Sequence, residues 1–244
     1  MERLIDGAQQ LLGLKLTPQQ RQAFRLYHKE LMEWNARFNL TAVTDPEGVQ
    51  IRHFLDSLSC LLVISDDAIV QSLIDVGSGA GFPGLPLKII YPKLSLTLLE
   101  ATGKKANFLR HLVDLMELRD VTVINARAEE LGHDPTHREG YDWVVARAVA
   151  GMPTLVEYLL PLCRLGGRCL AQKGEGAAAE VSSAESAILL LGGRLNRLLP
   201  VELPGLAEIR HLVLIDKVAR TPTKYPRRPG IPTKRPLGDV KTAC

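Results

Sequence analysis

Apolar residues recur at helical spacing through the first third of the chain. Residues 2–12 predict a short helix, and Thr17, Pro18 and Gln20 mark the start of a second one, with Thr17 as its cap and Gln20 completing a capping box. Large apolar side chains then follow every three or four residues, at Phe24, Tyr27, Leu31, Trp34 and Phe38. This spacing predicts a long helix with one packed face.

A third helix is expected after Asp45, which precedes Pro46 in the position of a helix cap. Its apolar positions are Ile51, Leu55, Leu58 and Leu62. Another side of the same helix carries Arg52, His53, Asp56 and Ser57. Polar residues at this spacing are typical of a solvated face, although such a face can also look into a cleft. The pattern favours the solvated face.

From residue 72 onward, short apolar runs alternate with helical segments. We expect strands at 72–76, 95–100, 121–125, 142–146, 166–171, 194–201 and 210–216, the last closing the sheet. The helix between the second and third strands begins after Thr102, whose hydroxyl is expected to cap it. This alternation predicts an α/β fold of the Rossmann-like type, with a mostly parallel seven-stranded sheet flanked by helices.

The chain divides into three predicted parts: an N-terminal helical extension at 1–66, an α/β core at 67–217 and a basic, proline-rich tail at 218–244. Prolines exclude a regular helix from the tail, so we expect it to be extended. Residues 217–241 hold eight of the 30 lysines and arginines but only one acidic residue. Such a segment fits phosphate neutralisation, and it also fits a solvated, flexible end.

Composition and cysteine spacing restrict the class of protein further. The four cysteines, Cys60, Cys163, Cys169 and Cys244, lack the paired spacing of a metal site, and a chain of 244 residues needs no disulfide bonds for stability. No apolar run is long enough to cross a bilayer, and charged residues near the start argue against a signal peptide. We expect a cytoplasmic protein without a metal site, a monomer that does not associate with membranes.

The first predicted strand runs into four glycines, at positions 77, 79, 81 and 84. Glycine allows backbone conformations and close approaches that other residues do not, so this turn is expected to face a cofactor. In an open parallel sheet, ligands bind beyond the carboxyl ends of the strands. The residues in that position are Glu100, whose carboxylate can accept bonds from ribose hydroxyls, Ala128 and Glu129, which can contact an adenine, and Arg147.

Two cofactors fit the glycine turn. Gly79, Gly81 and Gly84 match the spacing of a dinucleotide fingerprint, which predicts a nicotinamide-dependent oxidoreductase. Counted from the end of the strand at Val76, however, the sixth turn position is Phe82, and prolines delay the helix that would hold a pyrophosphate. S-adenosylmethionine has no pyrophosphate and needs only a looser turn. The spacing favours the methyl donor and leaves the dinucleotide open.

Several motifs in order resemble one family. They are the segments 34–35, 39–43, 52–57 and 75–86, the residues around Arg147, the segment 172–174, and the tail segment 225–232. Together they span nearly the whole chain and are far more specific than a glycine loop. On these motifs the chain resembles the ribosomal RNA small subunit methyltransferase G family, also called glucose-inhibited division protein B.

The resemblance implies an S-adenosylmethionine-dependent enzyme that methylates N7 of a guanine at position 527, in the 530 loop of bacterial 16S rRNA. By matched position, the cofactor contacts it implies are Gly77, Gly79 and Phe82 in the first loop, Glu100 at the ribose, Ala128 and Glu129 at the adenine, and Arg147. Many members of the family have Asp where this chain has Glu100, which keeps the carboxylate but changes its reach.

The sequence lacks the groups that other methylation reactions need, and this absence agrees with methylation at N7. Guanine N7 has an in-plane lone pair and no proton to lose, so attack on a sulfonium methyl requires positioning without a general base, and we expect no catalytic acid or base. Residues 147–150 replace the Asn/Asp-Pro-Pro-aromatic turn of amine methylation. No cysteine stands after the fourth predicted strand for C5 methylation.

We expect the RNA, as 16S rRNA or the small ribosomal subunit, to contact a rim of basic and polar side chains. The candidates are Arg52, His53, Lys173, Arg227, Arg228, Lys234 and Arg235. Each of these residues can also be interpreted without a functional role, as a charge at a strand end, a core or surface histidine, or part of a solvated tail. A noncatalytic RNA-binding module is a further alternative to the enzyme.

Overall fold

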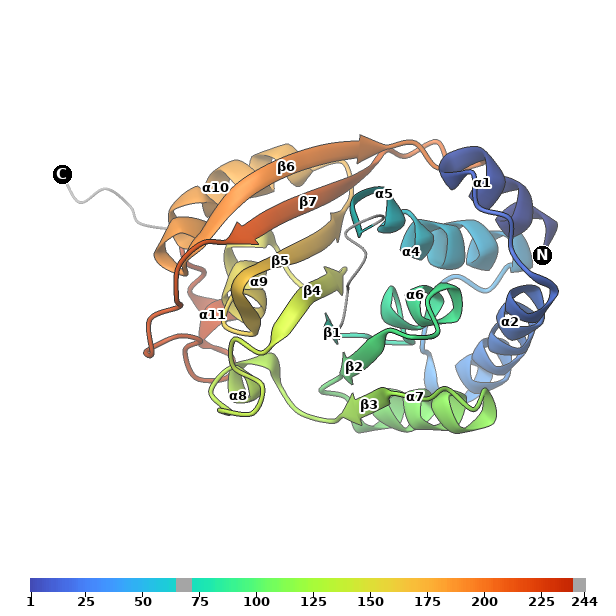
Figure 1. Ribbon diagram of the computed structural model, residues 1–244, viewed down its shortest axis with the longest axis horizontal. Coiled ribbons are helices and arrows are strands. Elements are labelled where there is room, and N and C mark those ends of the chain that lie inside the picture. The colour runs from blue at the N-terminus through green and yellow to red at the C-terminus, as the bar shows by residue number, and fades with distance from the viewer. Residues whose placement is uncertain (65–71, 239–244) are drawn as a thin grey trace.

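Seven strands form one sheet with helices on both faces (Figure 1). The computed structural model describes residues 1–64 and 72–238. The strands are β1 (Ser72–Val76), β2 (Ser95–Leu99), β3 (Val121–Ile124), β4 (Tyr141–Arg147), β5 (Cys163–Lys173), β6 (Gly193–Val201) and β7 (Arg210–Lys217). The helices are α1 (Glu2–Leu12), α2 (Pro18–Phe38), α3 (Pro46–Gly48), the π-helix η1 (Val49–Leu55), α4 (Asp56–Leu58), α5 (Leu61–Ile64), α6 (Gly84–Ile90), α7 (Gly103–Leu115), α8 (Ala128–Leu131), α9 (Met152–Leu159), α10 (Ala177–Leu190) and α11 (Ile231–Lys234). The mixed α/β fold with a mostly parallel sheet is confirmed.

The strand order is β3-β2-β1-β4-β5-β7-β6, and β1 to β5 run parallel to one another. The order reverses between β1 and β4, which is where ligands bind in such sheets. The last strand does not close the sheet as expected. β7 pairs antiparallel with both β5 and β6, so β6 forms the edge. Because β7 runs the other way, its first residue lies at the same edge as the carboxyl ends of its parallel neighbours.

The predicted strands are found at nearly their expected positions, and β5 differs most. It begins at Cys163, three residues before the expected start at 166, and runs through Gly166 and Gly167. The β4–β5 pairing shifts register at this place. A side chain at Gly167 would lie 2.8 Å from the carbonyl oxygen of Asp142, so glycine here permits close approach of the two backbones.

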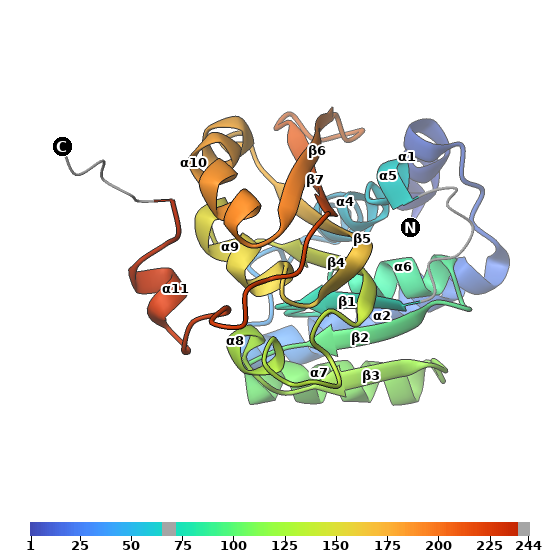
Figure 2. The same cartoon turned by 60° about the vertical axis from the view of Figure 1, so that its left-hand side comes forward.

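Apolar residues of the central strands alternate between two cores. Leu73 packs with the core that contains the N-terminal helices, α6 and α7, and its neighbour Ile74 packs with the core of α9 and α10. Successive side chains of a strand point to opposite faces, which places one core on each side of the sheet. Figure 2 shows α9 and α10 on one side of the strands and α4, α5 and α6 on the other.

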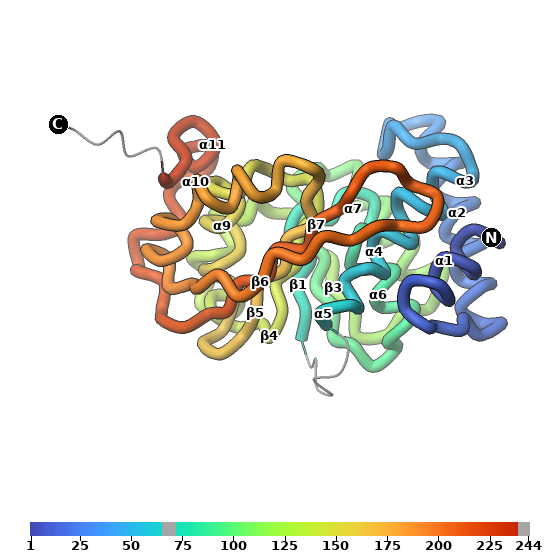
Figure 3. The backbone as a smooth tube through the Cα atoms, turned by 90° about the horizontal axis from the view of Figure 1, so that it is seen from above, coloured from blue at the N-terminus to red at the C-terminus, as the bar shows by residue number. Residues whose placement is uncertain are grey.

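The N-terminal helices are part of the main core and reach the glycine turn. The predicted capping box of Thr17 and Gln20 is present, and Phe24, Tyr27 and Leu31 are buried. The Tyr27 hydroxyl donates to the carbonyl of Ala80 at 2.5 Å. The helix expected after Asp45 is present too, but its middle is the π-helix η1. Gly205, in the segment after β6, lies next to Ile51 of η1. Figure 3 shows from above how the connection between β6 and β7 extends toward the N-terminal helices.

The C-terminal tail is extended except for one helical turn, α11, which corrects the expectation of a wholly extended tail. Pro232 is the second residue of this turn, a position where the missing amide proton of proline costs no helical hydrogen bond. The tail lies against α9: the Thr154 hydroxyl donates to the Pro232 carbonyl at 3.1 Å, and Tyr158 contacts Thr233 at 3.0 Å. The expected boundary between 66 and 67 lies outside the described residues, as do positions 239–244 of the tail.

None of the helices in the described ranges 1–64 and 72–238 has the length and apolar character needed to cross a membrane.

Asp75, near the end of β1, is a fully buried acid beneath the glycine turn. Its Oδ2 accepts a hydrogen bond from the backbone N–H of Gly84 at 2.9 Å and so fixes the start of α6. Burial is the main effect on this carboxyl and raises its pKa from 3.8 to about 7, against the lowering effect of the Gly84 bond.

We predict that Asp75→Asn changes the pH dependence of stability. Between about pH 4 and pH 7 the folded wild type keeps the Asp75 proton while the unfolded chain has lost it, so wild-type stability falls as pH rises. The variant lacks this term, and its free energy of unfolding should gain on the wild type by up to about 4 kcal/mol across that interval and then stay level. Urea denaturation at a series of pH values measures this, and parallel curves would contradict it.

Candidate functional site

Two neighbouring cavities open at the carboxyl ends of the parallel strands. The first, which we name the glycine-turn cavity, has a volume of about 580 Å³ and is lined by Gly77 after β1, Ala101 after β2, Ala128 and Glu129 after β3, and 149–151 after β4. The second, the basic cavity, has a volume of about 440 Å³ and begins at Arg147 and Ala148. The consecutive residues 147–151 therefore line both cavities in turn.

Gly77 brings backbone, without a side chain, to the first cavity, whereas Gly79 and the 6% exposed Glu100 are not part of its lining. Gly77 and Gly79 have φ values of +71° and +60°, a region that favours glycine. A Cβ atom at Gly77 would lie 2.7 Å from a methyl carbon of Val149, whereas one at Gly79 would have only the Gly77 carbonyl oxygen nearby, at 3.9 Å. Gly77 is thus the position where a side chain would fill space between the turn and the wall formed by Val149.

Glu100 braces this turn from beneath. Its Oε2 accepts from the backbone N–H of Gly79 at 2.9 Å, and its Oε1 accepts from the N–H of Thr102 at 2.7 Å. The expected hydroxyl cap of Thr102 on α7 is absent, because the Thr102 side chain makes no capping bond. Each carboxylate oxygen of Glu100 retains a second lone pair. Its neighbours Leu99 and Ala101 line the cavity.

Ala128 and Glu129 open α8 at the far side of the same cavity. Glu129 is 4% exposed, and its Oε1 accepts from the backbone N–H of Gly230 at 3.0 Å. Thr233 and Pro236 of the tail complete the lining next to it. The sequence placed Ala128 and Glu129 correctly at this edge, but it gave no sign that the tail forms part of the wall.

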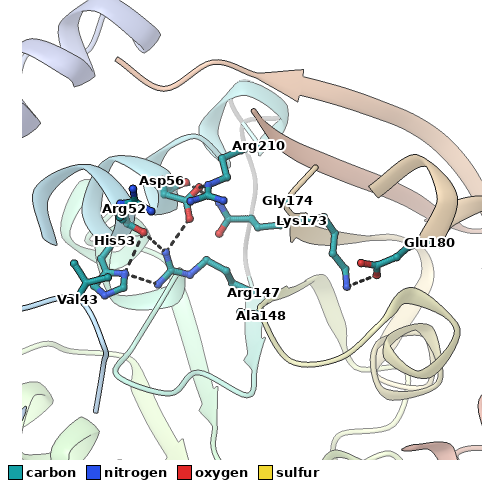
Figure 4. A pocket seen from close by; sticks show the side chains of 11 residues that line it. Val43, Arg52, His53, Asp56, Arg147, Ala148, Lys173, Gly174, Glu180 and Arg210 are labelled. Carbon is teal, nitrogen blue, oxygen red and sulfur yellow. Dashed lines mark hydrogen bonds and ion pairs between the residues drawn. The ribbon is translucent and has the colours of Figure 1, made fainter. Parts of the chain in front are cut away.

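Arg147 lines the basic cavity and not the glycine-turn cavity, and Phe82 of the glycine turn lines neither. Arg147 ends β4 and donates to Asp56 Oδ2 at 2.8 Å and to the Arg52 carbonyl at 2.9 Å (Figure 4). Its guanidinium carbon is 4.8 Å from the centre of the Phe82 ring, which also stacks on Tyr27 and His53. Phe82 is 5% exposed and supports the Arg147 guanidinium from the interior.

The expectation that Asp56 and Ser57 lie on a solvated face was wrong. Asp56 is 4% exposed and Ser57 is fully buried. The Arg147 ion pair compensates the Asp56 charge, and the Ser57 hydroxyl donates to the His53 carbonyl at 2.6 Å. Helical spacing alone cannot anticipate such partners from a distant strand. The π-helical turns before Asp56 also change the residue spacing, and such turns are frequent at functional sites.

Arg52 and His53 line the basic cavity with different charges. Arg52 is exposed and lies 3.3 Å from Glu208. Burial, together with the nearby Arg147 charge, lowers the pKa of His53 to about 4, against a raising contribution from its bond to the Arg52 carbonyl. His53 is therefore neutral at pH 7, and it contributes an imidazole ring but no positive charge.

The basic cavity contains three residues that did not stand out as site candidates in the sequence, namely Asp56, Gln172 and Arg210. Gln172 is the last residue but one of β5. A search of the carboxyl ends of the parallel strands, where ligands bind, could therefore have found it. Arg210 is the first residue of β7 and escapes that search because β7 is antiparallel. Lys173 also lines the cavity, where its ammonium group donates to the Ala150 carbonyl at 2.5 Å and to Glu180 at 2.7 Å.

The four tail candidates separate into two kinds. Arg227 is bound to the fully buried Glu157, with an Nη2–Oε2 distance of 2.6 Å and a bond from its backbone N–H to Oε1 of 2.7 Å. Hydrogen bonding to Glu157 raises the pKa of Arg227. Arg228, Lys234 and Arg235 are exposed. The structure thus places Arg227 in the packing of the tail and the other three on the surface.

Comparison with known proteins identifies relatives over the whole chain. A family model described as rRNA small subunit methyltransferase G matches residues 20–213. A protein of Roseiflexus castenholzii named ribosomal RNA small subunit methyltransferase G is 57% identical over 225 residues, which cover 92% of this chain and 95% of the relative. One of the same name from Roseiflexus sp. strain RS-1 is 55% identical over 237 residues, covering 97% and 100%.

Solved structures share the fold at low identity. TrmN from Thermus thermophilus aligns with a TM-score of 0.51 and 19% identity over 69% of this chain and 53% of its own. A predicted O-methyltransferase from Agrobacterium tumefaciens aligns with a TM-score of 0.51 and 22% identity over 64% and 78%. The comparisons support neither the oxidoreductase nor the noncatalytic RNA-binding alternative. The chain belongs to the rRNA small subunit methyltransferase G family.

Proposed function

We propose that this protein transfers the methyl group of S-adenosylmethionine to N7 of a guanine in small-subunit rRNA, at the position numbered 527 in bacterial 16S rRNA. The observation that carries the proposal is the pair of adjoining cavities, one against the glycine turn and one lined by Arg147 and Arg210, which share the segment 147–151. A methyl donor and an acceptor base require two pockets that meet at one point.

In this proposal the glycine-turn cavity holds the donor. Gly77 and Gly79 offer backbone without side chains, Glu100 keeps free lone pairs for ribose hydroxyls, and Ala128 and Glu129 stand at the adenine end. A dinucleotide fits less well. The first amide of α6, at Gly84, already donates to Asp75, and a pyrophosphate would need that helix start.

The residues of this chain would act by positioning. When bound, S-adenosylmethionine supplies an electrophilic methyl group. Guanine N7 carries a lone pair and no proton, so no residue has to remove one. Arg147 packs on the Phe82 ring, and Lys173 holds the Ala150 carbonyl, which keeps the segment 147–151 in place. Excluding water from this junction would complete the contribution of the protein.

The exposed basic side chains of the tail would contact RNA phosphates. Arg228, Lys234 and Arg235 lie close in sequence to Thr233 and Pro236, which line the glycine-turn cavity. We place Arg52 of the basic cavity in the same role, whereas the neutral His53 would contact RNA through its ring. The protein would act as a monomer in the cytoplasm on 16S rRNA or the small subunit.

We predict that Gly77→Ala weakens S-adenosylmethionine binding at least tenfold, because the new methyl group would enter the space between the turn and Val149. Gly13→Ala is the matched control: Gly13 has a similar φ of +64°, and an added Cβ there would meet nothing within 4 Å. Calorimetric titration measures both affinities, and circular dichroism checks both folds. Equal donor affinity in the two variants would place the donor elsewhere.

We predict that replacing Arg228, Lys234 and Arg235 with glutamine weakens RNA binding and flattens its salt dependence by about two units of the log–log slope, since each phosphate contact contributes roughly 0.7 to 0.9. The control replaces the exposed Arg25, Lys29 and Arg37 of α2. This helix lies on the opposite side of the molecule from α11 of the tail (Figure 1). It removes the same charge and should leave the slope nearly unchanged. Two identical slopes would remove the tail from RNA binding.

Arg227 needs a separate test because it is bound to Glu157. We predict that Arg227→Gln lowers the free energy of unfolding by about 3 kcal/mol, since it leaves a buried carboxylate without its partner. Denaturant titration measures this value. A variant as stable as the wild type would show that the ion pair does not hold the tail in place.

A further inference from the structure

Buried polar atoms without a hydrogen-bond partner gather in the basic cavity. Asp56 Oδ1, Gln172 Oε1 and Arg210 Nε all have this property, and all three residues line the cavity. Among the described residues, the other side-chain atoms of this kind, His28 Nε2 and Asp75 Oδ1, do not belong to this lining. An unpaired buried polar atom is unfavourable, so a cluster of three indicates a ligand that supplies the missing partners.

Neighbouring contacts leave these particular atoms without a hydrogen bond. Asp56 accepts from Arg147 through its other oxygen, Oδ2, at 2.8 Å, while Oδ1 forms an ion pair with Arg210 Nε at 3.9 Å, a distance too long for a hydrogen bond. The Gln172 amide donates to the Asp56 carbonyl at 2.6 Å and lies 3.3 Å from the Ser59 hydroxyl. These contacts hold the amide group and leave its oxygen without a partner.

The three atoms define a hydrogen-bonding pattern. Asp56 Oδ1 and Gln172 Oε1 are acceptors, and Arg210 Nε–H is a donor. A matching ligand presents two donors and one acceptor. The Watson–Crick edge of guanine has this arrangement, with N1–H and the exocyclic amine as adjacent donors and O6 as the acceptor. Adenine, cytosine and uracil each lack two adjacent donor groups on that edge.

We propose that the basic cavity binds the target guanine by its Watson–Crick edge, with Asp56 and Gln172 accepting from N1–H and the exocyclic amine and Arg210 donating to O6. The inference rests on the proposed function, because it takes the target base to be a guanine methylated at N7. N7 lies on the imidazole side of the base, away from N1 and the amine, so a guanine held in this way leaves N7 free to face the glycine-turn cavity. Asp56 and Gln172 are specificity residues in this arrangement and take no part in the transfer itself.

The charge of the cavity fits a nucleotide better than a free anion. Asp56 stands among Arg52, Arg147 and Arg210 (Figure 4). A phosphate group placed against its carboxylate would be repelled, whereas a base with N–H donors would be attracted. The exposed Arg52 remains able to hold the phosphates on either side of an unstacked base. Enzymes that modify a base often read it in this way, after it has left the stack.

The test compares RNA carrying guanosine at the target position with RNA carrying inosine, which keeps N7, O6 and N1–H but lacks the exocyclic amine. The wild type should methylate the guanosine RNA with a kcat/KM at least tenfold higher. Rates are divided by those of uncatalysed methylation of the two nucleosides, since the missing amine also changes the reactivity of N7. A buried acceptor that is left without its donor accounts for a preference of this size.

The variants are Gln172→Met and Asp56→Asn, and Gln50→Met serves as the matched control. Gln50 is a buried glutamine whose amide lies near Leu4 and Pro46 and outside the lining of the cavity. Gln172→Met should lower kcat/KM for guanosine RNA toward the inosine value and reduce the preference to less than about threefold. Asp56→Asn should lower kcat/KM on both RNAs, since both retain N1–H. Gln50→Met should keep the full preference, and Gln172→Met should keep its affinity for S-adenosylmethionine.

The outcomes distinguish a failure of this inference from a failure of the proposed function. Transfer to guanosine and inosine RNA at equal normalised rates would overturn this inference and leave the proposed function standing. A Gln172→Met enzyme that is slower but keeps the tenfold preference would also overturn it, because Gln172 would then serve packing alone. No transfer to either RNA by the wild type, with the modification absent from small subunits, would instead contradict the proposed function.

Discussion

The ion pair between Asp56 and Arg147 joins the two parts of the chain from which the site is built. Asp56 belongs to the helical segment before the sheet, and Arg147 ends the fourth strand. Both side chains are largely buried, at 6% and 13% exposed, so removing Asp56 would leave the Arg147 charge without its ion-pair partner in the interior. Arg147 also lies over Phe82, which stacks on Tyr27, and Tyr27 bonds to the glycine turn. The ion pair thereby connects the helical segment, the end of the fourth strand and the glycine turn.

The fold was predictable to a large extent because its signals are local. Alternating apolar runs marked all seven strands, and the capping box at Thr17 marked a helix start. The edge at which the site lies also followed from the sequence, since parallel strands carry their carboxyl ends to one side. Gly77, Ala128 and Glu129 all line one cavity at this edge.

What escaped prediction depends on partners far away in the chain. In the sequence, Asp56 has the pattern of a solvated residue, and only the structure shows its ion pair with Arg147. Arg227 likewise has the pattern of a charge in a basic tail, and only the structure shows its ion pair with Glu157. Arg210 was missed for another reason, since it begins its strand. In a sheet with one reversed strand, the first residues of that strand reach the same edge as the last residues of the others. A search limited to the carboxyl ends of strands overlooks the reversed strand.

The contact between Glu129 and Gly230 makes the glycine-turn cavity depend on two distant parts of the sequence. Thr233 and Pro236 form part of the wall of this cavity, which otherwise comes from residues 76 to 183. A cut in the chain before Gly230 would remove this part of the wall, although all seven strands, the last of which ends at Lys217, would still be present. The boundary of the cavity therefore does not coincide with the boundary of the sheet.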